Sequence, residues 1–250
     1  MRFFDTHLHL PRADEGGLDE FLRFVDMEPG LVGGNLILNT AEEVAVVASH
    51  AARLPATIVP IPYFDAATRS PEVVSGSGWY KIHPRLHAVD LEAIPMLVEA
   101  VAARAPRGVI VHAFPWGSDR RFDDVSLPLV IALARALPET PVLVAHGGGY
   151  QAWAFRAHAG GFRNVHFDFS VTLDYYERSD LVSPLKRYLR FSPNCVHFGS
   201  DWPSGDVGRQ VEELLRLADE IGLGQPALEQ LLLQNARSCW PTAFTTHAPQ

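Results

Sequence analysis

Short apolar runs alternate with amphipathic runs along the whole 250-residue chain. The apolar runs, such as Val109-Ile110-Val111 and Val142-Leu143-Val144, are continuous, which is typical of parallel strands buried on both faces. The pattern predicts eight strands, at Arg2–His7, Gly34–Asn39, Thr57–Phe64, Gly78–His83, Gly108–Ala113, Pro141–His146, Asn164–Phe169 and Asn194–Gly199.

Segments with helical periodicity follow most of these strands. Thr40 and Glu43 have the spacing of a capping box, which predicts a helix from Thr40 to about Arg53. Other helices are predicted at Leu18–Met27 (after Gly16-Gly17), Asp90–Arg104, Val125–Leu137, Gln151–Ala159, Leu181–Leu189, Val207–Ile221 and Ala227–Cys239, with Ala66–Ser77 as the weakest candidate. This alternation indicates a parallel sheet with crossover helices, and eight repeats favour a closed barrel.

The sequence therefore predicts an α/β protein, a single (β/α)₈ TIM barrel. About 250 residues is a usual length for this fold, and we find no linker or low-complexity segment. We expect one domain over residues 1–250, with a C-terminal tail from about residue 241.

Composition and charge limit the classes of protein, partner and compartment that we expect for this chain. Apolar residues make up 47% of the chain, and no run approaches the roughly 20 apolar residues that a membrane helix needs. The net charge of −8 disfavours nucleic acid, whose binding depends on Lys and Arg. With no visible signal peptide and only Cys195 and Cys239 as cysteines, we expect a cytoplasmic protein with neither membrane nor nucleic-acid partners. A homo-oligomer stays open, because Trp240 could fill an interface or the core.

Residues that bind metals or catalyse reactions gather where the predicted strands end. In a barrel these ends meet at one rim, which carries the active site. His7 and His9 are two residues apart on a strand, so their side chains point the same way, about 6–7 Å apart. His112 and the Asp201 carboxylate would complete a site of three nitrogens and one oxygen. Each residue alone also fits a packed or turn position; their coincidence on one rim favours metal binding or catalysis.

The strand-end motifs resemble those of the amidohydrolase superfamily, most closely its branch of amidohydrolase-related hydrolases and decarboxylases. The motifs are Asp5-Thr6-His7-Leu8-His9, Lys81-Ile82-His83-Pro84, Val111-His112, Ala145-His146-Gly147-Gly148, Gly199-Ser200-Asp201-Trp202-Pro203 and Leu233-Gln234-Asn235-Ala236-Arg237. The resemblance runs from residue 3 to about residue 240.

The resemblance implies one divalent metal ion, usually zinc, bound by His7, His9, His112 and Asp201. It also implies that His146 polarises the substrate or orients the attacking water, and that Asp201 can act as a base. Relatives with two metals carry a carboxylated lysine on the fourth strand, where Lys81 stands. Some lactonases of this branch keep the histidines and the aspartate yet work without a metal.

The same residues suggest a reaction on physical grounds. A metal ion activates water and polarises a carbonyl, Asp201 could accept the proton of that water, and His146 could donate to the developing oxyanion. We therefore predict a metal-dependent hydrolase of an amide, ester or lactone bond. The alternatives are a nonoxidative decarboxylase of an aromatic or dienoic acid, a metal-independent lactonase and a non-catalytic relative. A nuclease of the TatD type is more remote, because those enzymes resemble phosphodiesterases with a glutamate where Lys81 stands.

Cationic and aromatic residues follow the rim and predict a small, carboxylated substrate, because arginine binds a carboxylate through two parallel hydrogen bonds. The predicted substrate-binding residues are Lys81, His83, Arg85, Trp116 and Trp202. A solvated loop or helix packing would explain several of them as well.

Overall fold

The computed structural model describes residues 1–67, 70–71, 78–114, 125–176 and 179–244. Each of the eight predicted strands is present. They are β1 (Phe3–His9), β2 (Leu31–Leu38), β3 (Ile58–Pro62), β6 (Trp79–Ile82), β7 (Gly108–His112), β8 (Val142–Ala145), β9 (Val165–Asp168) and β10 (Val196–His197).

The strands pair in parallel in two arcs, β1-β2-β3 and β10-β9-β8-β7-β6. Two isolated bridges join the arcs: Tyr63 pairs with Lys81 on one side, and Leu8 pairs with Trp202 on the other. At the second junction the Thr6 amide also donates to the Phe198 carbonyl over 2.9 Å. The arcs therefore close into a (β/α)₈ barrel, as the alternating pattern predicts.

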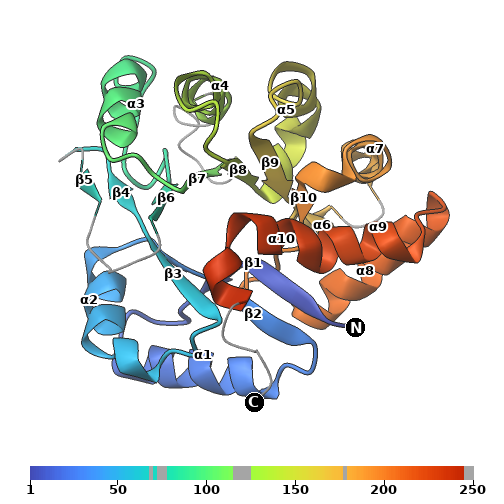
Figure 1. Cartoon of the computed structure of the whole chain (residues 1–250), viewed down its shortest axis with the longest axis horizontal. Helices are drawn as coiled ribbons and strands as arrows, with labels where there is room; N and C mark the ends of the chain where they lie inside the picture. Colours follow the sequence, from blue (N-terminus) through green and yellow to red (C-terminus); the bar gives the residue numbers. More distant parts are fainter. Residues whose placement is uncertain (68–69, 72–77, 115–124, 177–178, 245–250) are drawn as a thin grey trace.

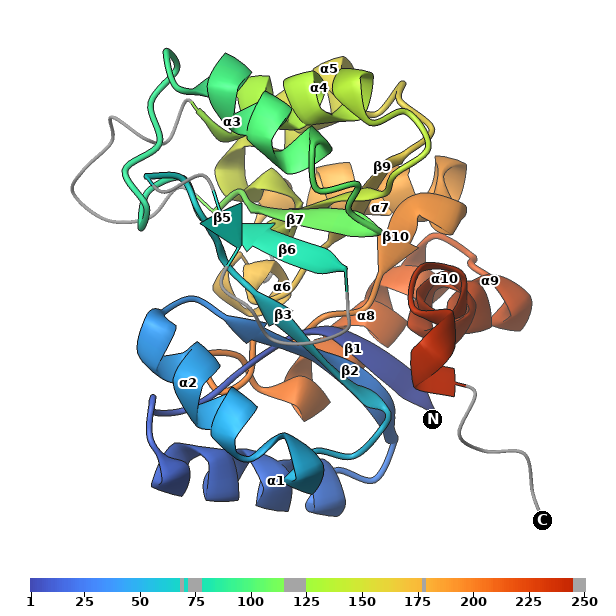
Figure 2. The same cartoon turned by 60° about the vertical axis from the view of Figure 1, so that its left-hand side comes forward.

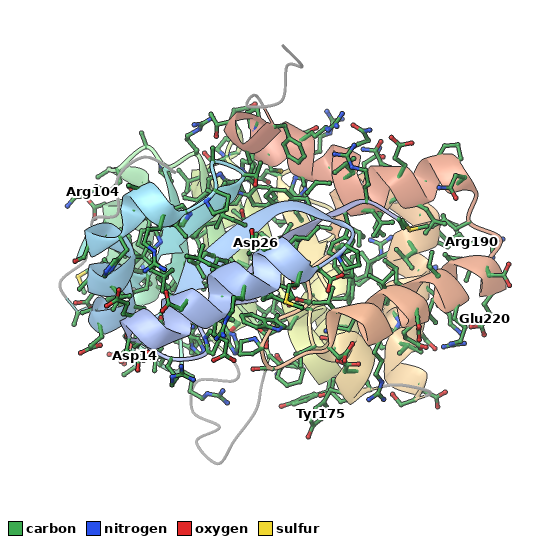
Figure 3. All side chains as sticks on the ribbon, turned by 90° about the horizontal axis from the view of Figure 1, so that it is seen from below. Asp14, Asp26, Arg104, Tyr175, Arg190 and Glu220 are labelled. Carbon is green, nitrogen blue, oxygen red and sulfur yellow. The ribbon has the colours of Figure 1, made fainter. Side chains whose placement is uncertain are left out.

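The helices cover the outside of the barrel (Figure 1). They are α1 (Glu15–Met27), α2 (Ala41–Ser49), α3 (Ile94–Ala102), α4 (Ser126–Ala136), α5 (Ala152–His158), α6 (Thr172–Tyr175), α7 (Ser183–Phe191), α8 (Val207–Glu220), α9 (Gln225–Glu229) and α10 (Asn235–Cys239), with a π-helical segment at Gln230–Gln234. Helix α1 runs across the surface between Asp14 and Asp26 (Figure 3). Among the described helices, none is both long and apolar enough to cross a membrane.

Several predicted boundaries shift for identifiable reasons. Helix α1 starts before the two glycines, because the Asp14 carboxylate accepts a hydrogen bond from Gly17 N (2.7 Å) and caps it. The capping box of Thr40 and Glu43 is confirmed at the start of α2. The predicted helix at 66–77 is wrong where the structure describes this range: β5 (Ser70–Pro71) is a strand, which pairs antiparallel with β4 (Phe64–Asp65). Residues 68–69 and 72–77 lie outside the described residues. Helix α6 is short and was not predicted.

The C-terminal segment seals the end of the barrel where the strands begin (Figure 2). Trp240 is 2% exposed, and its ring stacks on Phe4 with centroids 5.7 Å apart and lies 4.5 Å from that of Trp79. Trp240 is therefore a core residue within one chain. The turn at Pro241–Phe244 also packs here, with the Phe244 ring 5.2 Å from Phe4, so the expected tail is packed as far as residue 244.

Candidate functional site

Strand β1, which carries the Asp-x-His-x-His motif, is hydrogen-bonded to the loop that carries Asp201. The carboxylate of Asp5 is fully buried and its Oδ1 accepts hydrogen bonds from the backbone amides of His7 (2.9 Å) and Ser200 (3.0 Å). Burial raises the pKa of this carboxyl to about 7. The Asp201 amide in turn donates to the His7 carbonyl over 2.8 Å. Because of these contacts, His7 and Asp201 lie side by side where the first and last strands of the barrel meet.

In both His7 and His9 a hydrogen bond at Nδ1 determines which ring nitrogen keeps a lone pair. Nδ1 of His7 donates to Asp168 Oδ2 (3.2 Å), and Nδ1 of His9 donates to the Ile37 carbonyl (3.2 Å). Burial first, and Lys81 second, lower the pKa of His7 to about 3, so its ring is neutral. In the tautomer that these hydrogen bonds favour, Nε2 of each ring carries the lone pair.

Both lone pairs face the same carboxylate oxygen. Asp201 Oδ1 lies 3.5 Å from His7 Nε2 and 3.3 Å from His9 Nε2. Burial would raise the pKa of Asp201, but the imidazoles of His9, His146 and His7 close to its carboxylate hold it well below its usual range. Three acceptor atoms that converge in this way repel one another unless a cation lies between them.

The donor set fits a divalent metal ion. One ligand atom from each of His7, His9 and Asp201 lies within 4.8 Å of the others, and the same holds for His7, His146 and Asp168. Imidazole nitrogens and a carboxylate oxygen are the ligands of catalytic zinc sites.

Lys81 competes for the same position. Its side chain is 1% exposed, and Nζ lies 3.0 Å from His7 Nε2. Burial lowers the pKa of Lys81 to about 8, although Asp168 and Asp201 act in the opposite direction. The ammonium group thus donates to the lone pair that a metal ion would use.

His146 and His112 form a second pair above the site. Nδ1 of His146 lies 3.0 Å from the Ser170 carbonyl, to which it donates, so its Nε2 is an acceptor, 3.1 Å from His112 Nδ1. In this tautomer a neutral His146 offers a lone pair at Nε2. His112, expected as a ligand, lies beside His146 and the Phe114 carbonyl (3.2 Å from Nε2), outside the group formed by His7, His9 and Asp201.

Asp168, which sequence reasoning missed, organises the centre of the site. Its Oδ2 accepts from His7, and its Oδ1 accepts from the backbone amides of His146 (3.0 Å) and Ser170 (3.1 Å). Burial would raise the pKa of Asp168, but the contacts with His7, His146 and Ser170 keep it well below the usual range. Its position at the end of the seventh predicted strand, on the rim, is the sequence signal that could have found it.

Both His146 and Asp201 have left-handed backbone conformations, with φ of 62° and 63°. Non-glycine residues in this region cost about 1–2 kcal/mol each and occur often at functional sites. The side chains of both residues line one cavity of about 340 Å³ on this rim. The full lining is His9, Leu10, Pro11, Asn39, Glu43, Lys81, His83, His112, His146, Asp201, Pro203 and Ser204.

The predicted substrate-binding residues divide between this cavity and other places. Lys81 and His83 line it, and the His83 ring stacks on His112 with centroids 3.8 Å apart. Trp202 does not line it: its ring stacks on Phe24 of α1, 4.1 Å away, because its backbone closes the barrel beside Leu8 and turns the indole outward. Arg85 is absent from the lining, and its Nη1 is buried with no hydrogen-bond partner among the described residues. Trp116 lies outside the described residues.

A family model described as "Amidohydrolase" matches residues 10–242. The chain belongs to the amidohydrolase family. This membership agrees with the barrel, and the protein is an enzyme of the amidohydrolase superfamily. The matched range begins just after His7 and His9, so the geometry of those two residues rests on the structure itself. No curated protein matches the chain.

Solved structures with the same fold include three that cover nearly all of this amidohydrolase. An uncharacterized TIM-barrel protein from Bordetella bronchiseptica has a TM-score of 0.72 at 16% identity, over 98% of this chain and 100% of its own. A probable 2-pyrone-4,6-dicarboxylic acid hydrolase from Acinetobacter baumannii, solved with citric acid bound, has a TM-score of 0.60 at 13% identity, over 96% and 100%. A TatD homologue from Escherichia coli has a TM-score of 0.51 at 18% identity, over 96% and 98%. At these identities the likeness concerns the fold.

Proposed function

We propose that this amidohydrolase is a metal-dependent hydrolase that opens an ester or lactone bond, or a related amide bond, in a small carboxylated molecule. The observation that carries the proposal is the convergence of His7 Nε2, His9 Nε2 and Asp201 Oδ1, three acceptors on one point of the rim. A divalent cation, with zinc as our candidate, satisfies all three.

A metal ion held by His7, His9 and Asp201 would polarise the substrate carbonyl and make water more acidic. The ionised Asp201 carboxylate accepts the proton of the attacking water and passes it to the leaving oxygen as the carbon–oxygen bond breaks. An ester or lactone gives a carboxylic acid, which releases its proton to water, and an alcohol, and an amide gives an amine in place of the alcohol. His146 lines the same cavity and offers its Nε2 lone pair as a second proton acceptor.

The charge of the cavity supports the substrate class. Lys81 is a buried cation in the wall, next to the neutral His83. An anionic group on the substrate would pair with this ammonium. The likeness in fold to a probable hydrolase of a pyrone dicarboxylic acid makes a lactone with carboxylate groups a natural first substrate to test.

One observation favours a second candidate, a metal-independent lactonase. The contact between Lys81 Nζ and His7 Nε2, at 3.0 Å, supplies a cation to the same lone pair without a metal. In that case Asp201 still serves as the base and Lys81 stabilises the negative charge that develops on the carbonyl oxygen.

The test is turnover of a panel of lactones and esters, including 2-pyrone-4,6-dicarboxylate, by zinc-loaded and metal-stripped protein. We expect hydrolysis only by the loaded protein, with ring-opened acids as products. Equal rates in both preparations would select the metal-independent mechanism. Release of CO₂ from the candidate acids, without hydrolysis, would contradict the proposal in favour of a decarboxylase.

A further inference from the structure

A second group of metal-binding side chains lies deeper in the barrel. It consists of His166 on β9, His197 on β10 and Cys239 at the end of α10, and we call it the lower cluster. His166 is two residues before Asp168, so it points to the same side of β9, about 6–7 Å closer to the end where the strands begin. The segment that contains Cys239 closes that end (Figure 2), where the Asn235 side chain donates to the Pro193 carbonyl over 2.7 Å.

The lower cluster brings together three ligand atoms of the kind that zinc prefers. His166 Nδ1 and His197 Nε2 are 2.9 Å apart, and one ligand atom from each of the three residues lies within 4.8 Å of the others. Two imidazoles and a thiol form a softer set than the histidines and carboxylate of the upper site.

The polar atoms of the lower cluster are not fully satisfied by the protein. Two neutral imidazoles carry two protons and two lone pairs, and the contact between His166 and His197 uses one of each. His197 is 2% exposed, and its Nδ1 has no hydrogen-bond partner among the described residues. An ion held between the two rings would bind His166 Nδ1 and His197 Nε2, the two nitrogens that face each other, and would take the place of the hydrogen bond between them.

We propose that His166, His197 and Cys239 bind a zinc ion that is separate from the catalytic site and fastens α10 to the inside of the barrel. Trp240 lies beside this site, and its ring packs edge-on against His197 with centroids 5.6 Å apart. Closed sites with sulfur and nitrogen ligands are typical of structural zinc. Burial raises the pKa of the Cys239 thiol to about 12.

The test uses Co²⁺ as the probe, because a thiolate bound to Co²⁺ absorbs in the near ultraviolet and the upper site contains no thiol. We expect the metal-stripped full chain to develop this absorption on titration with Co²⁺ and to lose it when Zn²⁺ is added. The Cys239→Ser protein should lack the absorption. The Cys195→Ser protein, the matched control, should keep it. The Asp201→Asn protein should keep it in full, which separates this site from the catalytic one.

Two results would overturn the proposal: no such absorption in the wild-type chain, or absorption that survives Cys239→Ser. Alkylation of the native wild-type chain gives an answer that does not depend on the folding of any variant. Zn²⁺ should slow the alkylation of Cys239, mapped by mass spectrometry. An unchanged rate for Cys239 at saturating Zn²⁺ would contradict the proposal.

Discussion

The two ends of the barrel use histidines in opposite ways. At the upper rim His7, His9 and Asp201 face an open cavity of about 340 Å³, and two of the residues that line this cavity, His146 and Asp201, have left-handed backbones. At the lower end His166 and His197 lie beneath Trp240 with a thiol in place of a carboxylate.

Residue type alone therefore does not decide the role of a histidine in this fold. At the rim, Asp168 and the Ile37 carbonyl fix the tautomers, so that lone pairs and a carboxylate converge where a substrate can reach them. In the lower cluster the two imidazoles face each other, and Trp240 packs against His197. We therefore expect changes at the rim to affect turnover and changes at the lower end to affect stability.

Asp201→Asn should have the largest effect on activity. The amide keeps the shape of the carboxylate but neither accepts a proton from water nor supplies the negative charge that a cation needs, so kcat should fall by about 10²–10⁴-fold. Steady-state kinetics on the lactone that the wild type hydrolyses measures this. Asp26→Asn, on the exposed side of α1 (Figure 3), is the matched control. A kcat within a factor of two of the control would remove Asp201 from the mechanism.

Trp240→Ala should have the largest effect on stability. The indole fills the space between Phe4 and Trp79, and emptying a core site of this size costs about 3–5 kcal/mol. Denaturant unfolding checks this, with Trp153→Ala as the control because Trp153 is 47% exposed. The kcat of the folded variant should stay close to that of the wild type. Loss of kcat without loss of stability would show that the two ends are not independent in the way we describe.

Asp168→Asn should weaken metal binding at the rim. The amide leaves the His7 ring without its charged partner, and such changes behind a metal ligand lower affinity by about 10–100-fold. Competition with a chromogenic chelator measures the zinc affinity, again against Asp26→Asn. Unchanged affinity would mean that Asp168 only holds the backbone of His146 and Ser170.

The smallest predicted effect concerns the start of α2. Thr40 Oγ1 accepts a hydrogen bond from the Glu43 amide (3.3 Å), so Thr40→Ala should cost about 0.5–2 kcal/mol of stability. Thr40→Ser keeps the hydroxyl and is the control. Equal unfolding midpoints for the two variants would show that the cap contributes nothing measurable.

The eight strands and the shared rim could be predicted from the sequence because several buried parallel strands are continuous apolar runs and alternate with segments of helical periodicity. The ligand set was harder. His7 and His9 are neighbours on one strand, so their convergence is local, whereas the position of His112 depends on a hydrogen bond to His146 from another strand. Trp202 stands next to Asp201 in sequence, yet barrel closure turns its ring toward Phe24. The relation of Asp168 to His7 spans 161 residues and becomes visible only in the folded chain.

Metal dependence is tested most directly when the zinc content and the turnover of one preparation of the wild-type protein are measured together, before chelation, after chelation and after zinc is added back. We predict that turnover is lost when zinc is removed and returns when zinc is added back, and that His9→Ala, which lacks one of the three converging acceptors, does not recover at the same zinc concentration. Full turnover by wild-type protein verified to be free of metal would contradict the central claim and leave Lys81 as the cation of the site.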